Sequence, residues 1–288
     1  MGDWVHVPVM LEEVMSHLLN DREGTYWDGT FGRGGHSMAL LSQLMGLGKL
    51  VASDRDPLAQ AAAEPLLENP QFSFEPCDFA NMVAKIPYQL NGFLLDLGVS
   101  TPQLRDATRG FSFQEDGPLD MRMDPTQGMS AAELIDATSE RELADIIYQY
   151  GEERLSRRIA KAIKENRPVT RTAQLADICR MAYPRRHHRI HPATRTFQAL
   201  RIAVNRELDQ LADVIPRAAA KLKPGGRGVI ISFHSLEDRI VKRAYKALVA
   251  AGGFRLITKK PLIPSEEEAQ RNPAARSAKM RVIEREES

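Results

Sequence analysis

Short apolar runs alternate with helical patterns through the first hundred residues of this chain. After a helical pattern at 9–19, the strand-like runs and the helical patterns between them fall, in chain order, at 25–30, 36–45, 49–54, 57–67, 72–79 and 91–100. Parallel strands need crossover connections, and the crossover helices cover both faces of the sheet. The sequence therefore predicts an α/β fold with a largely parallel sheet.

The alternation stops at about residue 107 and resumes at about residue 207. Between these points a loop rich in Gly, Asp and Met precedes helical patterns with no strand signal, and an apolar strand run returns at 227–233. We expect a discontinuous domain formed by 1–106 and 207–288, and an inserted helical domain at 107–206. Ligands bind outside the carboxyl ends of parallel strands, where the insertion departs. The inserted domain should therefore overhang the active site.

Charge is distributed unevenly along the chain. The formal net charge is only +1, which by itself argues against a polyanionic partner, but residues 151–206 carry 14 basic and 4 acidic side chains. Residues 1–150 carry 9 basic and 23 acidic ones. A basic block of this kind is typical of a surface that binds a phosphate backbone, although solvated helix faces would give the same pattern. Its members include Arg154, Arg157, Arg158, Lys161, Lys164, Arg185, Arg186 and Arg189.

The cysteines and the apolar runs indicate the compartment. Cys77 and Cys179 are the only cysteines and lie far apart, so neither a disulfide framework nor a CxxC zinc motif is present. No apolar run approaches the roughly 18 to 20 residues of a membrane span, and the first residues lack the pattern of a signal peptide. We expect a cytoplasmic protein with no metal site and no membrane partner.

A glycine-rich turn at 28–36, with the sequence DGTFGRGGH, follows the first strand run. Glycines let the backbone approach a ligand, and the helix start offers unpaired N–H groups. Asp54 ends the next strand run, where a carboxylate can accept both hydroxyls of a ribose. The turn matches neither GxGxxG nor a phosphate loop, so S-adenosylmethionine suits it better than a dinucleotide or a triphosphate. Phe79, after the third strand run, is placed to cover the adenine.

The most apolar strand run carries Asp96 at its exit. A carboxylate in such a run is costly to bury without a partner, which favours a functional role. Asp96 can hold the methionine end of the cofactor or the methyl acceptor, and Gln103 follows nearby as an amide donor and acceptor.

Many long motifs occur here in one fixed order: DGTFGRGGHS, SDRDP, PCDFANM, RGFSF, GPLDMRMD, HPATRTFQALRI, LKPGG, SFHSLEDRIVK and NPAARSAKMR. From about residue 6 to 285 the chain resembles the bacterial family of 16S ribosomal RNA cytosine-N4 methyltransferases. The resemblance implies a class I S-adenosylmethionine-dependent methyltransferase fold, which is Rossmann-like, with an inserted all-α substrate-recognition domain. It also implies N4-methylation of a cytosine in the decoding region of 16S rRNA in the small ribosomal subunit. Whether the chain is a homodimer stays open.

The resemblance also implies site residues. The family's cofactor contacts carry over onto Gly34, Gly35, His36, Asp54, Phe79, Asp96 and Gln103. The usual SSPQLD of the family reads STPQLR at 100–105, so Arg105 replaces an acid and no role carries over to that position.

Transfer to a cytosine amine sets its own requirements. The N4 lone pair is delocalised into the ring, so in-line transfer needs acceptors that hold the amine and a group that takes its proton. Many amino-methyltransferases place a D/N/S-P-P-aromatic tetrapeptide at this strand end, where this chain has 100–103. The catalytic candidates are Asp96, Ser100 and Pro102. A backbone carbonyl, Asp120 or Asp124 are alternative proton acceptors.

The target base must be exposed and supported, commonly on an aromatic face. Phe111, Phe113 and His234 are candidates for this support, although two alternating phenylalanines often anchor a loop and a single His often satisfies a backbone group. The candidates for phosphate contacts are Arg109, Arg195, Arg185, Arg186 and Arg189.

Two other functions remain open. Pro76-Cys77 is similar to the nucleophile motif of cytosine-C5 methyltransferases, but that cysteine is expected after the fourth strand. The chain could instead be an RNA-binding ribosome-assembly factor on a methyltransferase fold. The intact glycine turn, Asp54 and Asp96 argue against this second alternative.

Overall fold

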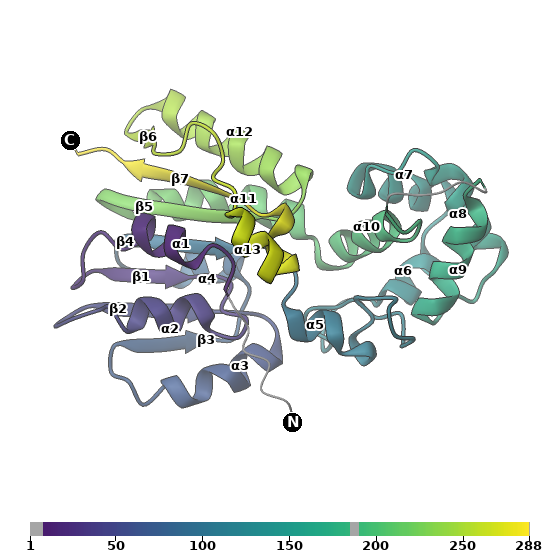
Figure 1. The fold of residues 1–288 in the computed structure, drawn as a ribbon, viewed down its shortest axis with the longest axis horizontal. Helices are drawn as coiled ribbons and strands as arrows, with labels where there is room; N and C mark the ends of the chain where they lie inside the picture. The colour runs from purple at the N-terminus through teal and green to yellow at the C-terminus, as the bar shows by residue number, and fades with distance from the viewer. Residues whose placement is uncertain (1–7, 185–189, 288) are drawn as a thin grey trace. The chain divides into compact units, whose positions relative to one another are not determined.

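The computed structural model describes residues 8–184 and 190–287. Contacts divide the chain into two compact units, Met1–Gly98 with Leu208–Ser288, and Val99–Glu207. The first unit contains the β-sheet and the second is helical (Figure 1).

The first unit is built on a seven-stranded sheet with the order β3-β2-β1-β4-β5-β7-β6. Strands β1 to β5 pair in parallel, whereas β7 is antiparallel to both β5 and β6. The predicted α/β class is confirmed, and this order with an antiparallel β7 is that of the class I methyltransferase fold. The strands are β1 (Thr25–Asp28), β2 (Lys49–Ser53), β3 (Phe72–Glu75), β4 (Leu90–Asp96), β5 (Leu222–Ser232), β6 (Phe254–Leu256) and β7 (Lys279–Arg285).

Helices cover both faces of this sheet. On β1, Tyr26 belongs to the core shared with α1, α2 and α3, whereas its neighbour Trp27 belongs to the core shared with α4, α11 and α12. Adjacent residues face opposite sides because side chains alternate along a strand. The helices are α1 (Leu11–Leu18), α2 (Gly35–Leu41), α3 (Pro57–Ala63), α4 (Phe79–Lys85), α11 (Glu207–Ala220), α12 (Ser235–Ala251) and α13 (Glu266–Arg271), with 3₁₀ turns η1 (Glu64–Leu66) and η3 (Pro273–Ser277).

Two local features modify this regular pattern. Phe79 begins the short helix α4, because the Asp78 carboxylate accepts the Asn81 N–H and caps it. The KPGG segment lies within β5 as an irregularity, since Leu90 pairs with Leu222 while Gly92 pairs with Arg227.

The second unit is a bundle of short helices around its own core, which includes Ile147, Ile159 and Leu175. It starts at Val99, eight residues before the boundary expected at 107, because Val99 packs against this core. The helices are α5 (Thr101–Arg105), α6 (Ala131–Ala137), α7 (Glu140–Gly151), α8 (Ser156–Glu165), α9 (Thr172–Ala182) and α10 (Thr194–Asn205), with the 3₁₀ turn η2 (Ala107–Arg109). In the described part of the chain, no helix is long and apolar enough to cross a membrane.

Candidate cofactor site and active site

The sheet reverses its strand order between β1 and β4, so the carboxyl ends of these neighbouring strands form its switch point. Open α/β sheets bind their ligands at such a point. The glycine-rich turn leaves from β1, and Asp96 ends β4. The fold therefore brings the two strongest signals of the sequence to one edge of the first unit.

The turn requires glycine at two positions for its shape. Gly32 and Gly34 have φ values of +55° and +77°, in the region that L side chains rarely adopt. A Cβ on Gly34 would also lie 2.6 Å from Cζ of Phe31. These glycines let the chain pass tightly from β1 into α2.

Asp54 fixes the turn against the end of β2. Its Oδ2 accepts the Gly32 N–H at 2.8 Å, and its Oδ1 accepts the Asp56 N–H at 2.9 Å. Burial raises the pKa of this carboxyl above its ordinary value. Each oxygen retains a second lone pair, so the carboxylate can also accept ribose hydroxyls, as the sequence predicts.

Asp28 is a site residue that was not predicted from the sequence. Its side chain is only 2% exposed; it accepts the Ser37 hydroxyl at 2.6 Å and the Thr30 N–H at 3.0 Å. Burial raises its pKa to about 6 in spite of these hydrogen bonds. Asp28 is the last residue of β1, as Asp96 is of β4, and its carboxylate inside an apolar strand run was a signal that could have identified it.

Asp96 lies beside Asp28 on the neighbouring strand. Its Oδ1 is buried and has no hydrogen-bond partner among the residues that the structure describes. Burial raises its pKa well above the ordinary value, and the charges of Asp28 and Glu237 add to the effect. An orphaned carboxylate oxygen of this kind requires a ligand when it is ionised.

His36 connects Asp96 to the N-terminal segment. Its Nε2 lies 2.9 Å from the Val9 carbonyl, which can only accept, so Nε2 carries a hydrogen. Its Nδ1 lies 3.6 Å from Oδ2 of Asp96. The ring is only 7% exposed and is thereby fixed in orientation.

Glu237 is a second acidic residue that was not predicted. Its Oε2 accepts the Phe233 N–H at 2.8 Å and the His234 N–H at 3.2 Å. His234 caps α12, because its Nδ1 accepts the Glu237 N–H at 3.4 Å, and its Nε2 lies 3.2 Å from Glu237 Oε1. Among the described residues Nε2 makes no hydrogen bond in spite of this proximity, and the contact of His234 with a base stays a prediction.

These carboxylates fit a cationic cofactor. Burial, together with the charges of Asp28 and Glu237, raises the pKa of Asp96, so a nearby cation would favour the ionised form of this carboxyl. A sulfonium nucleoside with an amino group supplies positive charge, whereas a nucleotide phosphate would add to the repulsion.

Phe79, which the sequence places over the adenine, is 9% exposed and packs in the core with Trp27. A Cβ on Gly29 would lie 3.2 Å from Phe79 Cβ. The contact of Phe79 with the cofactor stays a prediction.

The second unit begins at Val99, shortly after β4, and its first residues form a helix cap. The Ser100 hydroxyl accepts the Gln103 N–H, and Gln103 Oε1 accepts the Ser100 N–H at 2.8 Å. This capping box leads into α5, with Pro102 in its first turn. Gln103 is buried by this role, and any contact that it makes with the cofactor stays a prediction.

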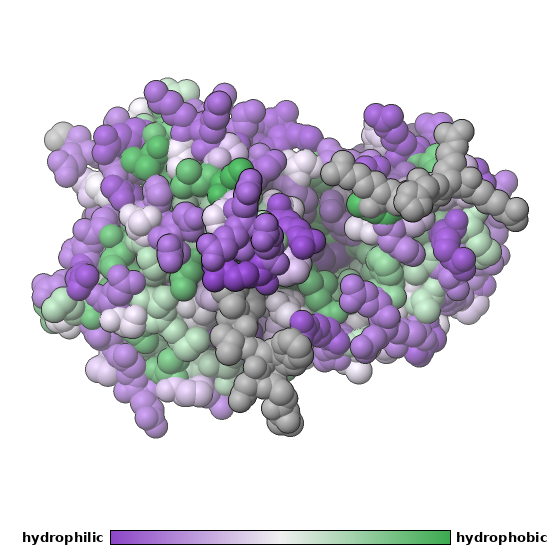
Figure 2. Space-filling model, in the orientation of Figure 1, coloured by the Kyte–Doolittle hydropathy of each residue, from purple (hydrophilic) through white to green (hydrophobic). Residues whose placement is uncertain are grey.

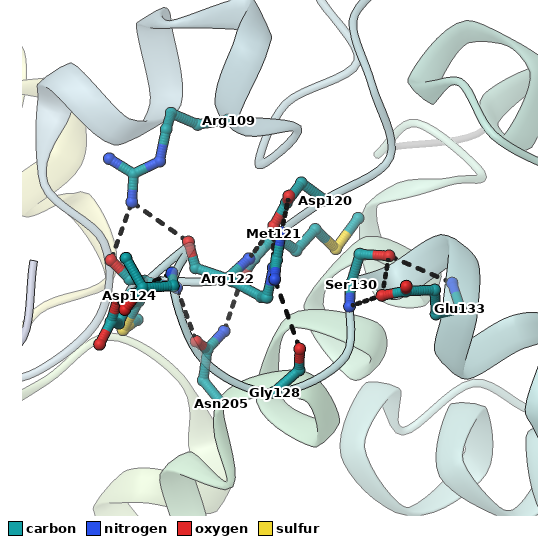
Figure 3. Close-up of polar contacts among 11 residues, drawn as sticks. Arg109, Asp120, Met121, Arg122, Asp124, Gly128, Ser130, Glu133 and Asn205 are labelled. Carbon is teal, nitrogen blue, oxygen red and sulfur yellow. Dashed lines mark hydrogen bonds and ion pairs between the residues drawn. The ribbon is translucent and has the colours of Figure 1, made fainter.

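The loop of the second unit that contains Asp120 and Asp124 is held by polar contacts (Figure 3). Asp120 accepts two hydrogen bonds from the Arg122 guanidinium, at 2.9 Å and 2.7 Å. Burial alone would raise the pKa of Asp120, but these bonds hold it below its ordinary value. Asp124 accepts from the Thr126 hydroxyl at 2.6 Å and from the Gln127 amide at 2.7 Å. Both carboxylates are engaged within the loop.

Two further side chains anchor the same loop. Arg109 Nη2 donates to the carbonyls of Arg122 and Met123 at 3.1 Å and 2.9 Å. Asn205 accepts the Met123 N–H and donates to the Met121 carbonyl, each at 2.8 Å. Figure 3 shows Arg109 and Asn205 both reaching this backbone. Arg109, predicted to contact phosphate, thus has a structural role.

The aromatic candidates lie mostly in the interior of the second unit. Phe111 is 6% exposed within its core, with the Arg109 guanidinium 5.7 Å from its ring centroid. Phe113 stacks at 4.5 Å on His191 and meets Phe197 edge-on at 4.8 Å. Both rings anchor their loop in this structure, and their use as base supports stays a prediction.

The remaining candidates are spread over both units. Arg195 lies 3.7 Å from the buried Glu153. Arg105 is exposed in the last turn of α5. Cys77 follows β3, and burial raises the pKa of its thiol. Arg185, Arg186 and Arg189 lie outside the described residues.

Known proteins resemble this chain along nearly its whole length. The sequence profile of the MraW methylase family matches residues 3–286. A protein named ribosomal RNA small subunit methyltransferase H from Synechococcus elongatus is 51% identical over 97% of this chain and 94% of its own. Proteins of the same name from Chromohalobacter salexigens and Coxiella burnetii are 48% and 47% identical, over 99% and 97% of this chain and 92% and 98% of their own.

The putative rRNA-methylase of Clostridium thermocellum, a solved structure, aligns with a TM-score of 0.49 at 11% identity, covering 96% of this chain and 94% of its own. The profile match and the identity of about half to full-length relatives establish the family of this chain. The chain belongs to the MraW methylase family and is a methyltransferase whose methyl donor is S-adenosylmethionine.

Proposed function

We propose that this chain methylates the N4 amine of a cytosine in the decoding region of 16S rRNA, acting on the small ribosomal subunit in the cytoplasm. The names of its relatives support an rRNA substrate of the small subunit. The observation that carries the chemistry is the buried, unpartnered Oδ1 of Asp96 at the switch point of the sheet.

The residues of the first unit would bind and orient the cofactor. The bound cofactor supplies a methyl group activated by a sulfonium charge. Asp54 accepts the ribose hydroxyls, and Asp28 and Glu237 add negative charge that favours a cation. Pre-organised charge of this kind costs no reorganisation when the reaction occurs.

Asp96 is the best placed proton acceptor among the carboxylates considered. Its raised pKa makes it a stronger base than an ordinary carboxylate, once a nearby positive charge favours its ionised form. Asp120 is a weaker base because Arg122 lowers its pKa. Asp124 already accepts from Thr126 and Gln127. Ser100 and Pro102 would position the substrate amine rather than take its proton.

Methyl transfer tests this function directly. The protein would be incubated with methyl-labelled cofactor and small subunits, naked 16S rRNA or tRNA, and the labelled atom mapped by mass spectrometry. We expect label on N4 of one cytosine of 16S rRNA, its loss in Asp96→Asn, and its retention in the control Asp213→Asn, an exposed aspartate of α11. Label on a ring carbon, or on tRNA alone, would contradict the proposal.

The two alternatives predict other results. A cytosine-C5 enzyme needs a thiolate, whereas burial raises the pKa of Cys77 and its Sγ contacts Met82 Sδ at 4.0 Å. Cys77→Ala should therefore retain methyl transfer. An assembly factor without activity would show no cofactor binding by calorimetry, although it would still bind RNA.

A further inference from the structure

A basic pocket lies in the first unit, and none of the carboxylates of the cofactor site lines it. It has a volume of about 200 Å³ and is lined by side chains of α12 and of the segment after β6. No lining residue among those that the structure describes is acidic. The polar lining consists of Lys242, Lys246, Lys259, Lys260, Arg281 and Thr258.

Most of this positive charge is not neutralised by the residues that the structure describes. Arg281 is paired, because its Nε lies 2.7 Å from Oδ1 of Asp238 and its side chain is 10% exposed. The four lysines are exposed, and within 8–184 and 190–287 no carboxylate forms an ion pair with any of them. An array of exposed ammonium groups without counter-charges attracts an anion.

Two hydrogen-bonded hydroxyl groups also line the pocket. Tyr245 is 1% exposed, and its hydroxyl donates to the Gly228 carbonyl at 3.0 Å. Thr258 Oγ1 accepts the Val282 N–H at 2.9 Å, so its own hydrogen can be donated into the pocket. A fixed hydroxyl surrounded by lysines matches the chemistry of a phosphate group, which accepts hydrogen bonds and carries negative charge.

The charge extends beyond the pocket as a line. Residues 239–260 carry seven basic side chains and no acidic one, while residues 1–98 of the same unit carry 5 basic and 13 acidic ones. Arg239, Lys242 and Lys246 recur at helical spacing over about 10 Å of α12. Figure 2 shows hydrophilic side chains over α12. A line of charges suits a polymer of phosphates better than one small anion.

We propose that this pocket and the adjoining face of α12 bind the phosphate backbone of the substrate RNA, as a contact surface on the methyltransferase unit itself. This inference rests on the proposed function, because it takes rRNA as the ligand. Backbone contacts orient a nucleic acid without reading its sequence. The surface would therefore increase affinity for RNA uniformly and leave the choice of the target base to other residues.

Two double variants test the inference. Lys242→Gln with Lys246→Gln removes the charge on the helix, and Lys259→Gln with Lys260→Gln removes it on the segment after β6. Lys49→Gln with Lys85→Gln is the matched control elsewhere on the same unit. Binding to 16S rRNA would be measured over a range of salt concentrations, with cofactor affinity measured by calorimetry to show that each variant is folded.

The association constant for RNA falls with rising salt concentration, and each phosphate contact contributes about 0.7 to 0.9 to the steepness of that fall on a log–log plot. Each pocket variant removes two lysine charges and should therefore make the slope less steep by about 1.5. The control should keep the slope of the unmodified protein, and cofactor affinity should stay unchanged throughout. Slopes equal to that of the control in both pocket variants would overturn the inference. So would lysine-dependent binding to phosphatidylserine vesicles with an unchanged RNA slope, which would assign the surface to membranes.

The same data separate this inference from the proposed function. If the unmodified protein methylates N4 and the pocket variants keep its salt slope, only the pocket assignment fails. If the unmodified protein neither methylates nor binds 16S rRNA, the proposed function fails first.

Discussion

Three aspartates at the ends of neighbouring strands differ in what surrounds each carboxylate. Asp54 accepts two backbone N–H groups, Asp28 accepts a hydroxyl and a backbone N–H, and Asp96 has one oxygen without a partner in the described chain. Hydrogen bonds stabilise the charged form of a carboxylate and burial destabilises it. At the residue scale, ionised carboxylates in this site are therefore destabilised by burial, and a cationic ligand would stabilise their charged form.

The first prediction concerns the pH dependence of stability without cofactor. The folded pKa of Asp28, about 6, lies above its unfolded value, so this residue contributes stability that is present at low pH and lost as pH rises through 6. Between pH 5 and pH 8 the loss should be about 1 kcal/mol. Asp28→Asn removes this dependence, because an amide does not ionise. Urea unfolding of both proteins at each pH measures it, and parallel pH profiles would contradict the assignment.

The second prediction concerns Gly34. An alanine there combines a φ of +77° with a Cβ 2.6 Å from the Phe31 ring, whereas Gly128 has a similar φ of +71° and nothing within 4 Å. Gly128→Ala should cost about 1 kcal/mol from backbone strain. Gly34→Ala should cost about 1 to 3 kcal/mol more, from overpacking, and should weaken cofactor binding. Denaturant unfolding and calorimetry measure both, and equal losses in the two variants would refute the steric argument.

At the element scale, helix α8 has two faces with separate tasks. Ser156, Ile159, Ala160 and Ile163 recur at helical spacing and are buried. Arg157 and Arg158 are exposed. Lys164 differs from these exposed arginines, because its ammonium group donates to the Ile135 and Thr138 carbonyls at the end of α6. The basic block predicted from the sequence is therefore not uniform.

The third prediction separates these tasks. Arg157→Gln with Arg158→Gln should lower the salt slope of RNA binding by about 1.5 if both side chains contact phosphate. Lys164→Met should instead lower the free energy of unfolding by about 1 to 3 kcal/mol, because two carbonyls at the end of α6 lose their donor. Its RNA salt slope should fall less than that of the double variant. Thermal unfolding and RNA titrations distinguish the two, and a stable Lys164→Met with a reduced slope would reverse the assignment.

At the scale of the whole molecule, the chain forms two units with separate cores. The carboxylates that fit the cofactor all lie in the first unit. The second unit contains α8 and the loop anchored by Arg109 and Asn205. Because the cores are separate, a substitution inside the second unit should leave the packing of the sheet unchanged.

The fourth prediction follows from this division. Cofactor at saturation should slow hydrogen exchange mainly in the first unit, at the turn around Gly32 and at the N–H of Asp96, because a ligand stabilises the structure that binds it. Amides in the core of the second unit, such as those of Ile147 and Ile159, should change little. Mass spectrometry after exchange measures this, and equal protection of both units would contradict separate tasks.

The fold class and the family could be predicted from the amino-acid pattern, and the cofactor contacts stay predictions. Alternating strand and helix patterns are local signals, and in a parallel sheet the strand ends meet at one edge whatever the loops do. Asp54 and Asp96 could therefore be assigned from their positions alone. The missing strand signals after β4 likewise indicated the inserted helical unit, with an error of eight residues at its start.

Which side chains already have partners within the chain became visible from the folded structure alone. Arg109, Phe111, Phe113, Asp120 and Asp124 all suit substrate contacts by type, yet each contacts its own loop or core, and such contacts join residues far apart in the sequence. The sequence patterns did not predict the position of Glu237 or the basic pocket beside α12, for the same reason. Burial and pairing depend on what packs against a residue, and a local pattern cannot specify that partner.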